Sequence, residues 1–290
     1  MNFGKLEDIS GIDFSLPQDH PFTSKNLKKK KTKEISVYVG AARWSRSELK
    51  GLYPRGTKDE LSYYATQFNS IELNATFYSM PSAEQIHIWR SKTPSDFKFF
   101  PKITSSISHY RRLINVVDKV TDFAMAVMNF EEQLGMIFMQ LHDNFKPKDY
   151  DRLEKFVKDW PQELPLAIEL RNEEWFSNKS VNAKVFQLFE ENNITAILVD
   201  TPGRRDVLHM HLTTSTAFIR YVSANDEVDI QRLDSWVERA TQWKQQGLEN
   251  LYFFVHQKVD KETPMLSAYL IESINKKWNT NYNVPKLANP

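Results

Sequence analysis

The fold is decided by residues 135–172, GMIFMQLHDNFKPKDYDRLEKFVKDWPQELPLAIELRN. Two short apolar runs, GMIFMQLH (135–142) and PLAIELRN (165–172), enclose DYDRLEKFVKDW (149–160), in which apolar residues recur at helical spacing. Runs of this length and composition are typical of buried parallel strands. The order strand, helix, strand therefore predicts a βαβ unit.

The same kind of run recurs six more times along the chain. These runs are SVYVGAA (36–42), SIELNATF (70–77), FKFFPKIT (97–104), TAILVDTP (195–202), TAFIRYVS (216–223) and NLYFFVHQ (250–257). Eight parallel strands alternating with helices are the number that closes a TIM-type barrel. We therefore predict an α/β fold, a single-domain (β/α)8 barrel. An open doubly wound sheet is the alternative, although the glycine-rich turn of nucleotide-binding sheets is missing after the first run.

Amphipathic helices are expected between most of these runs. The expected segments are 58–68, 82–92, about 115–130, 149–160, 181–193, 230–247 and about 265–278. Gly247 suits the end of the helix that precedes it, because glycine adopts the left-handed conformation easily. Residues 203–215 have little helical period, so a short or irregular element is expected there.

The first 34 residues differ from the rest of the chain. They have no sustained helical or strand period, and they end in a basic run, Lys28 to Lys31. We divide the chain into an N-terminal extension (1–34) outside the barrel closure and a barrel domain (35–290). Phe3, Ile12, Phe14 and Leu16 suggest that part of the extension packs on the outside of the barrel. The basic run is interpreted as a solvated linker or as a contact to nucleic acid or a partner.

Composition limits the possible functions. The formal net charge is +1, which gives no overall attraction to nucleic acid or anionic membrane. Cysteine is absent, which removes disulfides, thiolate metal sites and cysteine nucleophiles. The N-terminus lacks the apolar segment of a secretory signal, and no apolar run is long enough to cross a membrane. We expect a cytoplasmic protein of unknown oligomeric state.

Polar side chains occur late in the predicted strands, where a buried strand should avoid them. Residues two apart share a face, so each such pair points to one side of its strand. The pairs are Glu72 with Asn74, Lys102 with Thr104, Gln140 with His142, and Glu169 with Arg171; Asp200, Arg220 and His256 also lie late in their strands. Charges inside an apolar run need partners. They form either a ligand site at the carboxyl ends of the strands or a structural network of salt bridges.

These motifs resemble the YecE-like family, also called domain of unknown function 72. The resemblance rests on VGAARWS, IELNATFYSMPS, FKFFPKIT with the following His109, GMIFMQLH and AIELRNEEW, and it covers nearly all of residues 35–284. It implies a TIM barrel and no established activity. The recurrent polar positions of the family correspond in this sequence to Glu72, Asn74, Tyr78, Lys102, His109, Gln140, Glu169, Arg171, Trp175, Asp200 and Arg220. Asn172 departs from the usual histidine, and the motifs of the seventh and eighth strands also differ, so these strands can line the site differently.

Metal and cofactor motifs are weak. Glu72, Glu169, Asp200 and the histidines are residue types that bind cations, but no established ligand spacing is present. His209 and His211 are expected to be ordinary surface or core histidines whose ring nitrogens are hydrogen-bonded, rather than metal ligands. We expect no cofactor, and we expect that the chain folds without a metal.

The preferred hypothesis is an enzyme acting on a small polar or anionic substrate. Glu72 or Glu169 would be general acid or base, and Lys102 would pair with them or act itself. Arg171 and Arg220 would hold an anion, and Asn74 and Gln140 would orient it. Tyr78 and Trp175 are interpreted as rim aromatics or as packing. A non-catalytic ligand-binding or scaffold protein and a nucleic-acid-processing enzyme are the alternatives.

Overall fold

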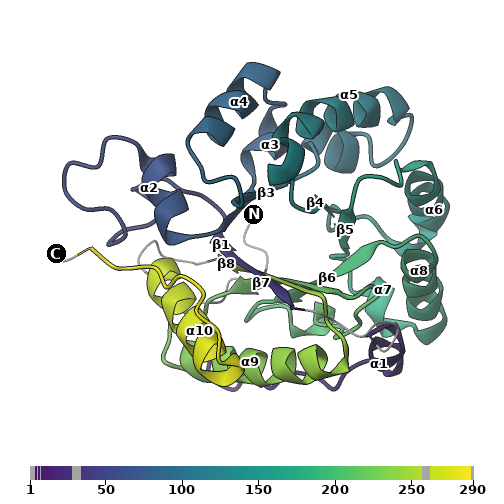
Figure 1. Ribbon diagram of the computed structural model, residues 1–290. Helices are drawn as coiled ribbons and strands as arrows, with labels where there is room; N and C mark the ends of the chain where they lie inside the picture. The colour runs from purple at the N-terminus through teal and green to yellow at the C-terminus, as the bar shows by residue number, and fades with distance from the viewer. Residues whose placement is uncertain (1–3, 5, 7, 28–33, 257–261, 289–290) are drawn as a thin grey trace.

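The computed structural model describes Gly4, Leu6 and residues 8–27, 34–256 and 262–288. Its centre is one sheet of eight strands in the order β3-β2-β1-β8-β7-β6-β5-β4, with the pairs along the sheet parallel. The strands are β1 (Ser36–Ala41), β2 (Ser70–Leu73), β3 (Lys98–Pro101), β4 (Ile137–Gln140), β5 (Leu166–Glu169), β6 (Thr195–Asp200), β7 (Thr216–Val222) and β8 (Asn250–His256). Helices surround this sheet (Figure 1). The predicted (β/α)8 barrel is confirmed.

The barrel closes between the two edge strands, β3 and β4. Isolated bridges pair Phe99 with Leu134 and Lys102 with Phe138 in place of a continuous ladder. At one end Gly135 N donates to Phe99 O over 2.7 Å. A Cβ at position 135 would lie 2.9 Å from both Phe99 O and the Phe100 ring, so glycine permits this close approach.

The outer ring follows the amphipathic pattern of the sequence. Its longer helices are α2 (Glu60–Gln67), α4 (Ala83–Ser91), α5 (Val117–Val127), α6 (Tyr150–Asp159), α8 (Lys179–Glu191), α9 (Val228–Gln246) and α10 (Thr263–Trp278). Short elements between them are α3 (Ala75–Tyr78), α7 (Glu174–Ser177), the π-helix η1 (Ser106–Tyr110) and the 3₁₀ turns η2 (Met128–Gln133), η3 (Pro147–Asp149) and η4 (Arg205–Val207). Helix α9 ends at Gly247, which has φ 115° as expected. Only η4 lies between β6 and β7 in the described chain, which agrees with the expected short element.

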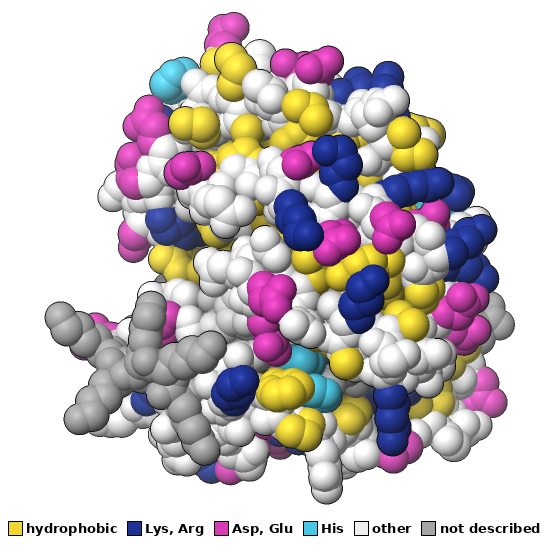
Figure 2. Space-filling model, turned by 90° about the vertical axis from the view of Figure 1, so that its right-hand side faces the viewer, with side chains coloured by type: hydrophobic (Ala, Val, Ile, Leu, Met, Phe, Trp, Pro, Cys, Tyr) yellow, Lys and Arg dark blue, Asp and Glu magenta, His cyan; other side chains and the backbone are white. Residues whose placement is uncertain are grey.

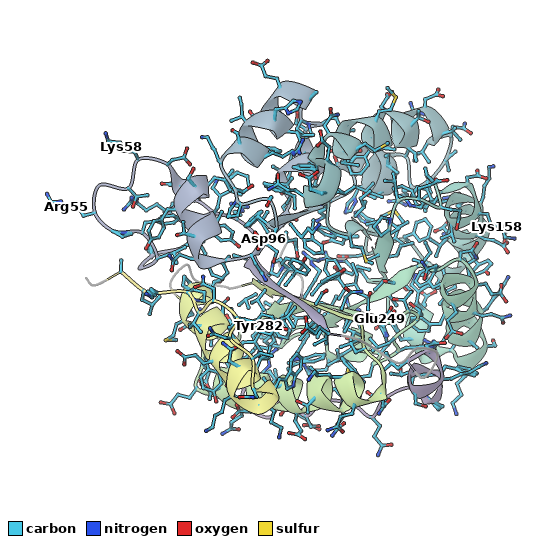
Figure 3. All side chains as sticks on the ribbon, viewed as in Figure 1. Arg55, Lys58, Asp96, Lys158, Glu249 and Tyr282 are labelled. Atoms are coloured by element: carbon cyan, nitrogen blue, oxygen red, sulfur yellow. The ribbon has the colours of Figure 1, made fainter. Side chains whose placement is uncertain are left out.

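The barrel interior is filled rather than hollow. Inward side chains of alternate positions form one apolar cluster that includes Phe100, Phe138, Phe218 and Phe254. Phe100 lies 4.9 Å from Phe254, edge to face, between ring centroids. Figure 3 shows side chains occupying the space inside the ring of strands. Ligand access is therefore limited to the ends of the strands.

The N-terminal extension takes the place of the missing helix between β6 and β7. It forms α1 (Pro21–Leu27), which the sequence pattern did not predict, and α1 lies between α8 and α9 in the ring (Figure 1). Leu27 is buried in the same apolar cluster as α9 and α10. Asn26 Nδ2 donates to Glu190 of α8 and to Leu212 O, each over 2.9 Å. A seven-residue helix has too few turns for a visible period, and these tertiary contacts stabilise it instead.

No strand comes from residues 1–34 within the described chain. The extension also packs through Leu16, as expected, and through Asp19, which accepts hydrogen bonds from Arg239 and Trp243 of α9. Phe14 lies 4.9 Å below the guanidinium carbon of Arg232. The extension and the barrel therefore share one hydrophobic core. Phe3 and the basic run from Lys28 to Lys31 lie outside the described residues.

Candidate functional site

Five strands end in polar side chains that face the same end of the barrel. Strand alternation indicates that they point inside, because four of the five lie two residues beyond the interior residues Phe100, Phe138, Ala167 and Phe254. They are Glu72 of β2, Lys102 just after β3, Gln140 of β4, Glu169 of β5 and His256 of β8. Arg220 of β7 joins them from the position two after Phe218. These side chains form the mouth cluster, together with Arg171 and Asn74.

Arg220 holds both carboxylates of the mouth cluster. Its Nε and Nη2 donate to Glu72 over 2.9 and 2.8 Å, and its Nη1 donates to Glu169. Burial and the two carboxylates act in opposite directions on the guanidinium, and the net effect raises the pKa of Arg220. Arg220 is thus a permanent cation at the centre of the site.

Glu72 and Glu169 are fully buried, yet both are held ionised. Burial alone would raise the pKa of Glu169, but Arg220 and Arg171 outweigh it and lower the pKa to about 2. Arg220 and His256 likewise keep the pKa of Glu72 well below its usual range, against the effect of burial. His256 Nε2 lies 2.9 Å from Glu72 Oε2. Both carboxylates are therefore committed to basic partners at neutral pH.

Lys102 is bound differently from the two arginines. Its Nζ donates to the amide oxygen Gln140 Oε1 over 3.1 Å and lies 4.3 Å from the centroid of the Phe77 ring. Burial, followed by the nearby Arg220, lowers the pKa of Lys102 to about 7. A large part of this amine is uncharged at neutral pH, and an uncharged amine can accept a proton or attack an electrophile.

Gln140 Oε1 accepts hydrogen bonds from three basic side chains. Besides Lys102 Nζ, it accepts from Arg171 Nη2 over 2.9 Å and from Arg220 Nη1 over 3.2 Å. Arg171 Nε in turn donates to Glu169 over 2.6 Å. Several N–H donors thus converge on one neutral acceptor, and such donors can also bind the oxygens of an anionic ligand.

His109 and Tyr78 lie toward the rim of the mouth. The half-buried His109 ring contacts Phe77 at a centroid distance of 4.9 Å and His142 at 5.2 Å, both edge to face. Burial and Lys102 lower the pKa of His109 to about 4, so the ring is neutral at physiological pH. Tyr78 is 77% exposed and contacts Phe77 from the outside. Phe77 thus links Lys102 to the rim.

Trp175 lies away from the mouth cluster. It is fully buried, its Nε1 donates to Phe145 O over 2.8 Å, and its ring stacks on Phe145. The interpretation of Trp175 as a rim aromatic therefore has no support in its position, whereas the packing alternative fits it. The neighbouring Asn172 accepts from Glu174 N and donates to Asp143 O, so it stabilises the turn after β5.

Asp200 also lies apart from the mouth cluster. Its neighbour Val199 faces the interior, so strand alternation turns Asp200 toward the helices. There it accepts hydrogen bonds from Arg232 Nη2 over 2.8 Å, from Trp236 Nε1 over 2.7 Å and from Arg205. The run TAILVDTP has apolar residues on both faces, so its sequence pattern could not show which way the aspartate points.

Two members of the site were not among the residues singled out for binding or catalysis. His256 follows Tyr252 and Phe254 at a spacing of two, and this period was a usable signal for an inward side chain. Phe77 had no such signal, because it enters the site from α3 after β2 has ended. Gln257, next to His256, lies outside the described residues.

The histidine pair His209 and His211 forms a separate cluster. His211 stacks on His20 of the extension at 4.0 Å and its Nε2 lies 2.7 Å from Glu190 Oε1. Figure 2 faces the side of α6, α8 and α1, and histidine side chains reach the surface there beside hydrophobic and acidic ones. In the part of the chain that the structure describes, no group of three or more acidic, histidine or cysteine side chains could hold a metal ion.

Comparison with known proteins identifies the family. The model of the family described as "protein of unknown function DUF72" matches residues 38–289. The chain belongs to this family. Escherichia coli YecE is 25% identical over 259 residues, which covers 83% of this chain and 93% of that protein. Bacillus subtilis YunF is 25% identical over 150 residues, or 49% of this chain and 52% of YunF.

A solved structure supports the barrel fold of the DUF72 family. The crystal structure of a DUF72 family protein from Enterococcus faecalis at 2.52 Å superposes with a TM-score of 0.67. It is 17% identical and covers 86% of this chain and 99% of its own, so the likeness concerns the fold alone. Among the described residues, none of the helices combines the length and apolar character needed to span a bilayer.

Proposed function

We propose that the protein is an enzyme that acts on a small polar, anionic substrate at the mouth of the barrel, with Lys102 as the base. The observation that carries this proposal is the state of the amine. Lys102 is 7% exposed, its Nζ is bound to an amide oxygen, and its pKa is lowered to about 7. A general base works best when its pKa lies near the operating pH.

Glu72 and Glu169 fit the role of general acid or base less well. Each accepts hydrogen bonds from an arginine, and each has a pKa far below neutrality. A carboxylate in that state neither holds a proton to donate nor takes one readily. Their contribution in this proposal is to fix Arg220 and Arg171, which face the ligand together with Lys102.

The anionic character of the substrate is supported by the donors around Gln140. Two guanidinium groups and one amine meet at its side-chain oxygen. Guanidinium groups match the oxygens of carboxylates and phosphates. Asn74, which donates to Glu72 over 2.8 Å, would orient the polar part of the ligand from the opposite side of the mouth.

A broad screen of small carboxylates and phosphate esters with the purified protein tests the proposal. We expect turnover of a substrate class by the wild type and a loss of at least about 100-fold in kcat for Lys102→Met, the usual contribution of one acid–base group. Lys98→Met is the matched control, because Lys98 lies at the other end of β3 and donates to Glu132 O. Saturable anion binding without any turnover would instead support a ligand-binding protein.

A further inference from the structure

The contacts around Lys102 suit covalent chemistry as well as proton transfer. Its backbone is fixed on both sides: Lys102 N donates to Leu73 O over 3.2 Å, and Thr76 Oγ1 donates to Lys102 O over 2.7 Å. The Nζ then lies between the Phe77 ring and Gln140 Oε1. A side chain held in this way presents its amine in one position, which a nucleophile requires.

Burial and the two neighbouring arginines favour the uncharged form of the amine and outweigh the opposite effect of Glu72 and Glu169. The charged and titratable groups that influence it are Arg220, Glu72, Glu169 and Arg171, and His109 reaches the same Phe77 ring. Both carboxylates are held by arginines, so the amine lies beside cations without a carboxylate bound to its nitrogen. A desolvated lysine next to another cation is the arrangement that activates an amine toward carbonyl groups.

From this geometry we infer that Lys102 forms an imine with a small carbonyl compound that carries a carboxylate or phosphate group. This inference rests on the proposed function for the location of the site and the charge of the ligand, and it adds the substrate class and a covalent intermediate. The guanidinium groups of Arg171 and Arg220, which converge on Gln140 Oε1, donate to the anionic group, while Lys102 Nζ meets the carbonyl carbon.

The step balances with the groups at hand. The Nζ lone pair forms a C–N bond, the carbonyl π pair moves to oxygen, and the proton lost from nitrogen goes to that oxygen. The hydroxyl then takes a further proton from solvent and leaves as water, while the nitrogen lone pair forms the C=N bond. The cationic imine attracts electrons from the neighbouring carbon, which acidifies its C–H bond or weakens its C–C bond. Lyase and isomerase reactions both use this effect.

Reductive trapping tests the imine directly. The full-length protein is incubated near pH 7.5 with levulinate and cyanoborohydride, and the products are analysed by intact mass and peptide mapping. We expect one reduced levulinate on Lys102. Lys102→Met and Lys102→Arg should lose this adduct, and Lys98→Met should retain it. Mapping in the wild type keeps the test valid even if a variant at position 102 folds poorly.

The neutral ketone 2-hexanone tests the substrate class, because its carbonyl has similar intrinsic reactivity. One charge-assisted hydrogen bond contributes about 1.5 kcal/mol, so levulinate should label Lys102 about tenfold faster than 2-hexanone. Equal labelling by both ketones overturns the anionic class. Labelling spread over surface lysines, or no adduct on Lys102, overturns the imine.

The two proposals fail separately. If a substrate is turned over and the reaction depends on Lys102, but no carbonyl probe is trapped, the imine is wrong and the acid–base role remains. If Lys102 is labelled selectively while the screen of carboxylates and phosphate esters gives no turnover, the imine holds and the proposed acid–base enzyme on those substrates is wrong.

Discussion

Arg220 of β7 donates two hydrogen bonds to Glu72 of β2, over 2.8 and 2.9 Å, across the mouth of the barrel. A third donor nitrogen of the same guanidinium binds Glu169. This arrangement uses the carboxylates that would otherwise pair with Lys102. The ion pairs of the mouth therefore hold the barrel end together, and they leave the lysine amine bound to an amide.

Glu169→Gln should destabilise the protein. The substitution removes the anion between Arg171 and Arg220 while both guanidinium groups stay buried. Breaking a buried pair by removing one partner costs roughly 3–5 kcal/mol, and Glu72 still pairs with Arg220, so we expect about 3 kcal/mol. Denaturant unfolding measures this change.

Glu174→Gln is the matched control for that substitution. Glu174 also pairs with a cation, Lys146 at 2.6 Å, but both side chains are largely exposed. Such surface pairs contribute little to stability, so Glu174→Gln should unfold like the wild type. If Glu169→Gln were as stable as this control, the mouth cluster would not be a structural network, and Glu169 would be a better candidate for a direct role in binding.

Lys102→Met should raise the free energy of unfolding while it removes activity. Charging a buried amine beside Arg220 is unfavourable, which is why the pKa of Lys102 falls to about 7. The unfolded amine has a pKa of about 10.4, so the wild type pays this penalty fully below pH 7 and loses it as the pH rises toward 10.4. We expect a gain of about 1–3 kcal/mol at pH 7 that shrinks with increasing pH.

Denaturant melts of the wild type and Lys102→Met at pH 6, 7, 8 and 9.5 check this dependence. A variant that is less stable at every pH would mean that Lys102 is a structural cation, and the proposal of an activated amine would then lose its main support.

The strand pattern allowed most of the fold to be predicted, and part of the site. Glu72, Gln140 and Glu169 end strands with clear interior positions, so their shared face followed from the period of two. The direction in which Asp200 points could not be predicted from this period, because β6 is apolar on both faces. The existence of helix α1 could not be predicted either, because its stability comes from contacts with α8 and α9 rather than from its own sequence.

Leu27→Ala tests the role of the extension. Leu27 is 1% exposed and packs in the cluster of α9 and α10, so truncating it should cost about 2–5 kcal/mol. Phe22→Ala, at a side chain that is 46% exposed on the same helix, should cost much less. The sequence alone suggested a separable segment; the packing of α1 predicts that deleting residues 1–27 lowers the melting temperature strongly. An unchanged melting temperature would show that the extension is peripheral.

His209 should make the protein sensitive to mild acid. Its Nε2 lies 3.0 Å from Ile197 O and its Nδ1 accepts from His211 N, which satisfies only the neutral ring. Burial and the nearby His211 lower the pKa of His209 to about 3. The unfolded histidine takes up a proton below about pH 6.5, and the folded one does not. The free energy of unfolding therefore decreases by about 1.4 kcal/mol for each unit by which the pH is lowered from 6.5 toward 3.

His209→Gln should reduce that slope between pH 6.5 and 4, measured as the free energy of unfolding, and leave the part that comes from His211, whose pKa burial also lowers to about 3. The exposed His87 gives the control, and His87→Gln should leave the slope as in the wild type. A wild-type stability that stays constant over this range would contradict the neutral, buried state of His209.

Asp200→Asn separates a structural aspartate from a ligand-binding one. Asp200 is fully buried and accepts from Arg232, Trp236 and Arg205 on the outer face of β6. Losing its charge leaves Arg232 with Asp229 alone, so we expect a loss of about 3 kcal/mol in the free energy of unfolding. Because Asp200 points away from the mouth cluster, labelling of Lys102 by levulinate should stay as in the wild type under conditions where the variant is folded. A variant of normal stability that no longer reacts with levulinate would instead place Asp200 in contact with the ligand, as the family resemblance implied.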